Sequence, residues 1–195
     1  TSSKGDIKTI LRAVYRHPEF EAAIGTKLKR PGEEYVSTAR ALNVWPNFSK
    51  LGVWKGITKD FAFVSNIVQH DLNKMAHVPL GWPFPDGYPD VATNWVNANS
   101  QILRWNTYGN FLQGGSWNQP DIGKLFPVVN KDIDAHIDQI AKTLLLTELG
   151  SADRKSIKNA VTKAFGTVPN FDSSSREISA GIARLIFQLP VWSLR

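Results

Sequence analysis

Apolar residues recur at spacings of three and four along most of this 195-residue chain, and strand-like alternation is nearly absent. Such spacing places the apolar side chains on one face of an α-helix, whereas a half-buried strand requires alternation at every second residue. We therefore expect an all-α fold, an irregular bundle of about seven helices. The length fits a single helical domain over residues 1–195, or one lobe of a larger protein.

Capping and breaking residues place the helices. The seven are expected to start at Asp6, Pro31, Thr58, about Asn94, Asp132, Ser151 and Ser174. Pro18 is expected to end the first helix and Gly150 the fifth, while Ser174 and Glu177 are expected to form a capping box for the last. The inward face of the first helix is expected to consist of Ile7, Ile10, Leu11, Val14 and Tyr15.

Two stretches, 76–93 and 113–130, cannot continue the helices and are expected to be long ordered loops. Between Pro79 and Asp90, six of twelve residues are proline or glycine. Prolines restrict the backbone, and the aromatic residues interleaved with them offer burial that offsets the cost of ordering. We expect Trp82 or Phe84 to insert between the third and fourth helices.

The same loop holds the strongest candidates for ligand binding. Aromatic faces combined with carboxylates are what a glycan requires, and the residues that offer them are Trp82, Asp86, Tyr88, Asp90 and, in the second loop, Trp117. The alternative is a rigid loop packed over the helices, in which Asp86 with the following glycine is only a turn signal.

His77 lies beside this loop, and with Asp86 and Asp90 it would form a minimal hydrolytic set. In the alternative interpretation His77 only ends a helix and interacts with the C-terminal dipole. No histidine–histidine or glutamate–histidine spacing typical of metal ligands is present, so we expect no metal site and no cofactor.

The composition excludes several classes of protein. Without cysteine the chain has no disulfide scaffold, cysteine-based zinc site, iron–sulfur cluster or thiol nucleophile. The net charge of +6 permits an anionic polymer as partner or simply a solvated basic face, and no motif for specific nucleic-acid recognition accompanies it. No apolar run approaches the roughly 18 residues of a transmembrane segment.

Two blocks of sequence resemble a known family. The first runs from His17-Pro18-Glu19-Phe20 through Gly25-Thr26-Lys27-Leu28-Lys29-Arg30-Pro31. The second includes Trp82-Pro83-Phe84-Pro85-Asp86-Gly87-Tyr88-Pro89-Asp90, Asn94-Trp95-Val96-Asn97 and Leu103-Arg104-Trp105-Asn106. In this order and spacing they resemble the C-terminal half of the bacterial family called domain of unknown function 1800. The resemblance implies a longer, helical and often exported protein with no agreed activity.

These observations lead to two expectations of function. The first is a non-catalytic binding or scaffold module of an exported, extracytoplasmic bacterial protein that recognises a cell-envelope or extracellular polymer such as a glycan. The second is the lobe of a hydrolase whose site is completed by a missing N-terminal half. In either case the chain is expected to pack against the missing N-terminal part of the same protein or against a partner chain.

Overall fold

The computed structural model describes residues 5–44, 71–113, 119–145, 147–167 and 169–194. Within these ranges the chain forms eight α-helices and no strand, which confirms the all-α fold; its one β-bridge pairs Leu28 with Leu194. The α-helices are α1 (Ile7–Tyr15), α2 (Pro18–Ala22), α3 (Pro31–Ala41), α5 (Ala98–Gln113), α6 (Ile122–Leu125), α7 (Ile133–Leu144), α8 (Ser151–Phe165) and α9 (Phe171–Phe187). Two 3₁₀ helices, η2 (Ala92–Asn94) and η3 (Pro190–Ser193), complete the described elements. Most of the helix expected from Thr58 lies outside the described residues.

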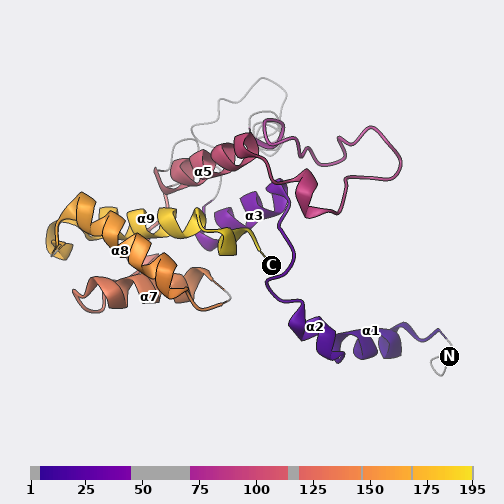
Figure 1. Cartoon of the computed structure of the whole chain (residues 1–195), viewed down its shortest axis with the longest axis horizontal. Helices are drawn as coiled ribbons and strands as arrows, with labels where there is room; N and C mark the ends of the chain where they lie inside the picture. The colour runs from indigo at the N-terminus through magenta and orange to yellow at the C-terminus, as the bar shows by residue number, and fades with distance from the viewer. Residues whose placement is uncertain (1–4, 45–70, 114–118, 146, 168, 195) are drawn as a thin grey trace, which may run out of the picture.

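Helix α9 forms the centre of the bundle (Figure 1), packing against α5, α6, α7, α8 and η3. The apolar positions of α9 follow the helical repeat, and Ile178, Ile182 and Ile186 are fully buried. Helix α3 packs against α5 on one side of this core. A fully buried Leu42 at the end of α3 joins the same hydrophobic cluster.

Local signals placed some helix ends correctly. The side chain of Asp6 caps α1 by accepting a hydrogen bond from the backbone N–H of Thr9 at 3.1 Å, and α3 begins at Pro31 as expected. Helix α8 starts at Ser151 and ends before Gly166, whose φ of 90° favours glycine.

Other expected helix ends were wrong. Helix α5 begins at Ala98 rather than near Asn94, because the side chain of Asn97 accepts a hydrogen bond from the backbone N–H of Ser100 at 2.8 Å. Helix α7 ends at Leu144, well before Gly150, which instead precedes α8. Helix α9 starts at Phe171, and Ser174 marks a kink inside it (φ −132°, ψ 21°).

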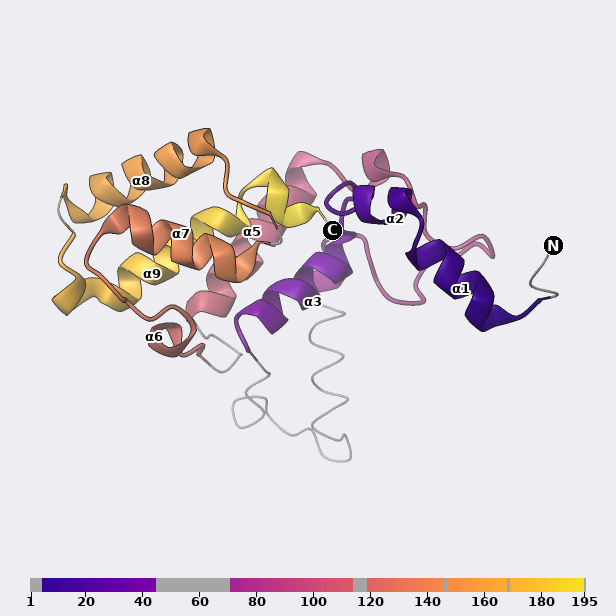
Figure 2. The same cartoon turned by 90° about the horizontal axis from the view of Figure 1, so that it is seen from below.

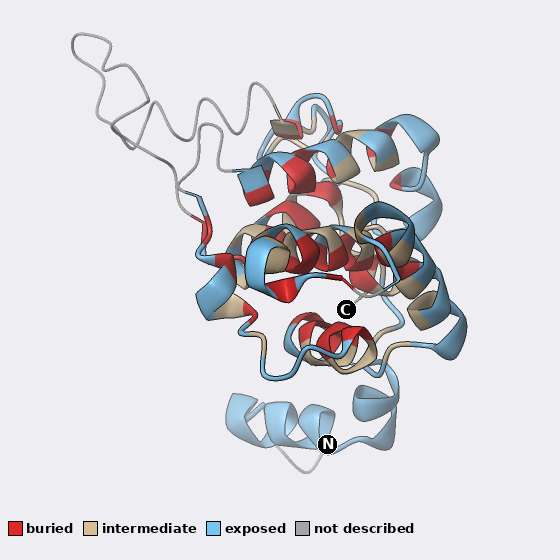
Figure 3. Cartoon of the chain, turned by 90° about the vertical axis from the view of Figure 1, so that its left-hand side faces the viewer, coloured by how far each residue is buried: buried red, intermediate tan, exposed pale blue. Residues whose placement is uncertain are grey.

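The expected inward face of the first helix is also wrong. No residue of α1 or α2 is buried (Figure 3), and Ile7 is 72% exposed. Figures 1 and 2 show both helices projecting away from the bundle at the N-terminal end. Amphipathic spacing fixed which side chains share a face, but not whether another element covers that face.

The stretch 113–130 differs from the continuous loop that was expected, because α6 lies within its described part. The side chains of Ile122 and Phe126 are each 1% exposed and attach this short helix to the core. Among the described helices, none is long and apolar enough to cross a membrane.

Candidate functional site

Residues 79–90 are held to the rest of the chain through Tyr88. Its hydroxyl donates a hydrogen bond to the carbonyl oxygen of Val78 at 2.8 Å and accepts one from the N–H of the same residue at 3.1 Å. Trp95, which is 7% exposed, donates from Nε1 to the carbonyl oxygen of Pro89 at 2.9 Å. Hydrogen bonds to backbone groups thus close both ends of the loop.

Five rings, here called the aromatic cluster, follow one another from the buried body to the tip of the loop: Trp95, His77, Tyr88, Trp82 and Phe84. The ring centroids of Tyr88 and Trp95 are 5.6 Å apart, those of Tyr88 and Trp82 are 5.0 Å apart, and those of Trp82 and Phe84 are 5.9 Å apart. These separations are typical of favourable aromatic pairs.

The order of the cluster corrects the expected anchor of the loop. Phe84 is 61% exposed and Trp82 is only partly buried, against Tyr88 and Phe84 of its own loop. Tyr88 and Trp95 attach the loop instead, because their polar atoms can reach backbone partners while their rings pack.

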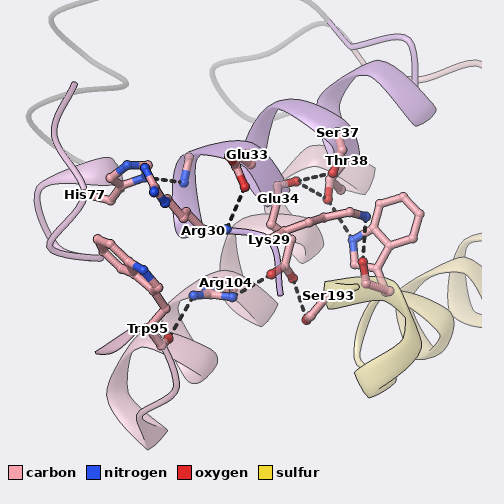
Figure 4. Close-up of polar contacts among 12 residues, drawn as sticks. Lys29, Arg30, Glu33, Glu34, Ser37, Thr38, His77, Trp95, Arg104 and Ser193 are labelled. Carbon is pink, nitrogen blue, oxygen red and sulfur yellow. Dashed lines mark hydrogen bonds and ion pairs between the residues drawn. The ribbon is translucent and has the colours of Figure 1, made fainter. Parts of the chain in front are cut away.

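His77 lies at the base of the cluster, facing α3 (Figure 4). Its Nδ1 accepts a hydrogen bond from the N–H of Gly32 at 2.9 Å, so the imidazole satisfies a free donor in the first turn of α3. Burial, together with the nearby Arg30 guanidinium, lowers the pKa of His77. A neutral ring with Nδ1 as acceptor is consistent with that shift.

The two candidate carboxylates have different partners. Asp86 accepts a hydrogen bond from Nε1 of Trp82 at 2.9 Å. Asp90 forms ion pairs with Lys27 and Arg30, each at 2.9 Å, and these hydrogen bonds lower the pKa of its carboxyl group. Across the described part of the chain, no group of three or more histidine and acidic side chains is arranged to hold a metal ion.

A buried ion pair lies next to Trp95, at the base of the aromatic cluster (Figure 4). Nη1 of Arg104 on α5 is 2.6 Å from Oε2 of Glu34 on α3, and the two side chains are 1% and 0% exposed. Nη2 of Arg104 donates to the carbonyl oxygen of Trp95 at 3.0 Å. The hydroxyl of Tyr108 donates to the other oxygen of Glu34, and burial and that carboxylate raise the pKa of Tyr108. The guanidinium thereby connects the core to the base of the cluster.

The C-terminal turn joins the same network. The hydroxyl of Ser193 donates to Oε1 of Glu34 at 3.2 Å, and Nε1 of Trp192 donates to the hydroxyl of Thr38 at 3.1 Å. Lys29 lies 4.3 Å from the centre of the Trp192 ring and donates to that residue's carbonyl oxygen at 2.7 Å. The C-terminal residues Trp192 and Ser193 therefore bond to α3 and to Lys29, which precedes α3.

Sequence reasoning did not identify Glu34 as a buried residue. A signal was present, because Glu34, Thr38 and Leu42 are four residues apart and share one face of α3 with the buried Tyr35. Phe84 was also missed as a ligand-binding candidate, since it was expected to be an anchor. Trp117, a candidate from the second loop, lies outside the described residues.

The tip of the loop presents the ring of Phe84 and the carboxylate of Asp86. His77 and the buried pair of Arg104 and Glu34 lie at the base of the cluster. The exposed ring of Phe84, beside the partly buried Trp82, is available to apolar ligand surfaces, and the exposed Asp86 is an acceptor for hydroxyl groups. His77, Asp86 and Asp90 each bond to a different partner. The structure brings Trp82, Asp86 and Tyr88 together.

Comparison with known proteins identifies a family but no characterised relative. No curated protein and no solved structure matches the chain. One family model, described as "Protein of unknown function (DUF1800)", matches residues 1–194. Because the match extends over essentially the whole chain, this protein belongs to the DUF1800 family.

Proposed function

We propose that this chain is a non-catalytic binding module of an exported protein and that residues 79–90 recognise a glycan of the cell envelope or extracellular matrix. The observation that carries the proposal is the exposed end of the aromatic cluster: Phe84 is 61% exposed and packs edge-on against Trp82, which is itself supported by Tyr88. Sugar rings have apolar C–H faces bordered by hydroxyl groups. Aromatic side chains and a neighbouring carboxylate complement both features.

The loop is held in one arrangement by contacts of its own side chains. Tyr88 bonds to both backbone groups of Val78, and Trp82 is oriented by its hydrogen bond to Asp86. A preorganised surface loses less conformational entropy on binding than a flexible one. The large exposed side chain of Phe84, on a loop held by these contacts, is therefore better explained by recognition than by packing.

A hydrolase lobe built on His77, Asp86 and Asp90 is less well supported. A general base must lie within hydrogen-bond reach of the proton it removes, and Nδ1 of His77 is already occupied by the N–H of Gly32. The ion pairs of Asp90 with Lys27 and Arg30 direct that carboxylate toward the chain itself. These contacts favour structural roles for His77 and Asp90, and leave Trp82, Phe84 and Asp86 as the ligand-facing residues.

Binding to insoluble polysaccharides tests the proposal. The chain would be incubated with peptidoglycan, chitin and cellulose, and the bound fraction would be measured at increasing protein concentration. For the polymer that is bound, Phe84→Ala and Trp82→Ala are expected to weaken binding about tenfold or more, as is usual for aromatic anchors at an interface. Asp86→Asn, which keeps an acceptor for Trp82, is expected to have a smaller effect.

Ile102→Ala is a matched control, because Ile102 is an apolar residue on α5, outside the loop, and is 52% exposed. The control is expected to bind as the unmodified chain does. Equal binding by all variants, or binding that moderate salt abolishes and any polyanion competes away, would show that only net charge is recognised. No binding to any of the three polymers would count against the glycan itself.

A further inference from the structure

We propose that Asp86 is a site of spontaneous covalent modification, where the aspartate converts to isoaspartate through a cyclic succinimide formed with the backbone of Gly87. Asp86 is the only aspartate of the sequence that is followed by glycine, and no asparagine is followed by glycine. The backbone nitrogen of a glycine is less hindered than that of any other residue, because glycine has no Cβ. The modification itself does not depend on the proposed glycan site.

The reaction needs only the loop and water. The backbone nitrogen of Gly87 attacks Cγ of Asp86, and the new C–N bond closes a five-membered ring. The hydroxyl of the protonated carboxyl group leaves as water together with the amide proton. A water molecule then opens the ring. Cleavage of the new bond restores aspartate, whereas cleavage of the original peptide bond leaves the chain running through Cβ and Cγ, with a free carboxylate on Cα.

The structure leaves both reacting groups accessible. Asp86 and Gly87 are exposed. The φ angle of Gly87 is 73°, and no described atom outside its chain neighbours lies within 4 Å of the place that a Cβ would take. The N–H of Gly87 donates to the carbonyl oxygen of Phe84 at 3.4 Å, which is long for a hydrogen bond. The nitrogen is therefore only weakly held away from the carboxyl group.

The bond between Asp86 and Trp82 does not block the reaction. Oδ1 of Asp86 accepts a hydrogen bond from Nε1 of Trp82 at 2.9 Å. Exposed side chains exchange rotamers within nanoseconds, whereas ring closure takes far longer. The carboxyl group therefore visits the orientation that faces Gly87 many times before it reacts.

Other described aspartates are less suited to ring closure. Asp90 is followed by Val91, whose branched side chain crowds the backbone nitrogen. Asp172 is followed by the smaller Ser173, but both residues lie in the first turn of α9 and the N–H of Ser173 donates to Oδ1 of Asn170 at 3.3 Å. Helical geometry fixes the backbone that would have to turn, so Asp172 is a matched internal control.

Isoaspartate would change the loop beside its exposed aromatic ring. The main chain gains one methylene group between Val78, which Tyr88 binds, and Pro89, which Trp95 binds. The carboxylate moves to Cα, so Trp82 loses the bond that orients it. A modified chain is therefore expected to bind glycan less well; this consequence rests on the proposed function.

Peptide mapping of the intact chain during storage at neutral pH tests the modification. Samples taken over several weeks would be digested, and isoaspartate would be detected by methyl transfer from S-adenosylmethionine with protein isoaspartyl methyltransferase. Label is expected to accumulate in the peptide that contains Asp86. Its rate is expected to lie within about tenfold of the rate in the urea-unfolded chain, because exposed loops open at little cost in free energy. The peptide that contains Asp172 is expected to stay far below its own unfolded rate.

Two variants test the ring. Asp86→Glu is expected to abolish the label, because its longer side chain would have to close a six-membered ring. Asp86→Asn is expected to form the same succinimide with loss of ammonia and to gain label faster, since the amide reacts without being protonated. Equal labelling of Asp86 and Asp172 in the folded chain would overturn the proposal, as would label that persists in Asp86→Glu.

Polysaccharide binding by the same samples separates the modification from its consequence. A loss of bound fraction that follows the label would support both. Label in a stored chain that binds peptidoglycan, chitin and cellulose no differently from fresh chain would support the modification and count against a role of Asp86 in glycan recognition.

Discussion

Replacing Arg104 by methionine is expected to destabilise the protein severely, although arginine is usually a surface residue. Its side chain is 1% exposed and its Nη1 lies 2.6 Å from Oε2 of the fully buried Glu34. Arg104→Met removes the opposite charge and also the donor to the carbonyl oxygen of Trp95. Breaking a buried pair in this way costs about 3–5 kcal/mol, a large part of the roughly 5–15 kcal/mol that stabilises a typical domain.

The physical cause of that loss is the charge left on Glu34, and a second substitution tests it. Glu34→Gln removes the charge and keeps an oxygen that accepts hydrogen bonds from Tyr108 and Ser193. The double variant Glu34→Gln/Arg104→Met is therefore expected to be about 1–3 kcal/mol more stable than Arg104→Met alone.

Urea denaturation followed by circular dichroism measures both quantities. Arg154→Met is the matched control, because Arg154 pairs with Asp138 at 2.6 Å but the two side chains are 43% and 42% exposed. Its loss is expected to cost less than about 1 kcal/mol. If Arg104→Met costs no more than this control, or if the double variant is no more stable than Arg104→Met, the reasoning from a buried uncompensated charge is refuted.

Three further predictions concern single side chains. Tyr88→Phe removes the hydroxyl that bonds both backbone groups of Val78, and the free energy of unfolding is expected to fall by about 1–2 kcal/mol; an unchanged value in urea denaturation would contradict this. Trp192→Ala removes a side chain that is 4% exposed, and a loss of about 3–5 kcal/mol is expected in the same assay. Burial lowers the pKa of His136, so the unfolded chain takes up the proton more readily and stability falls as the pH drops below about 6.5. Unfolding curves at several pH values check this, and His136→Gln, which leaves a polar partner for Ser179, is expected to reduce the dependence.

Local interactions explain which features the sequence predicted well. Asp6 caps α1 and Pro31 begins α3 because a cap or a fixed φ angle acts on residues within one helical turn. The all-α fold follows from the spacing of apolar residues in the same way. The boundary at Gly150 was wrong because Leu145 already has an extended backbone, which no signal within one turn of it indicated.

For the candidate site, the sequence identified the aromatic loop but not its internal order. Trp82, Phe84 and Tyr88 are equally plausible anchors from composition alone, since each offers a large apolar ring. The structure selects Tyr88, because its hydroxyl reaches both backbone groups of Val78. Phe84, which has no polar atom to bond, is left exposed at the tip.

What the sequence by itself determined was the helical class and the amphipathic faces, because both depend on neighbours three or four residues away. What only the tertiary structure decided was which faces are covered and which charges are paired. Glu34 and Arg104 are 70 residues apart, and Thr38 bonds to Trp192 across 154 residues. Contacts at such separations depend on how the helices pack, so the same kind of apolar stripe is buried on α9 and exposed on α1.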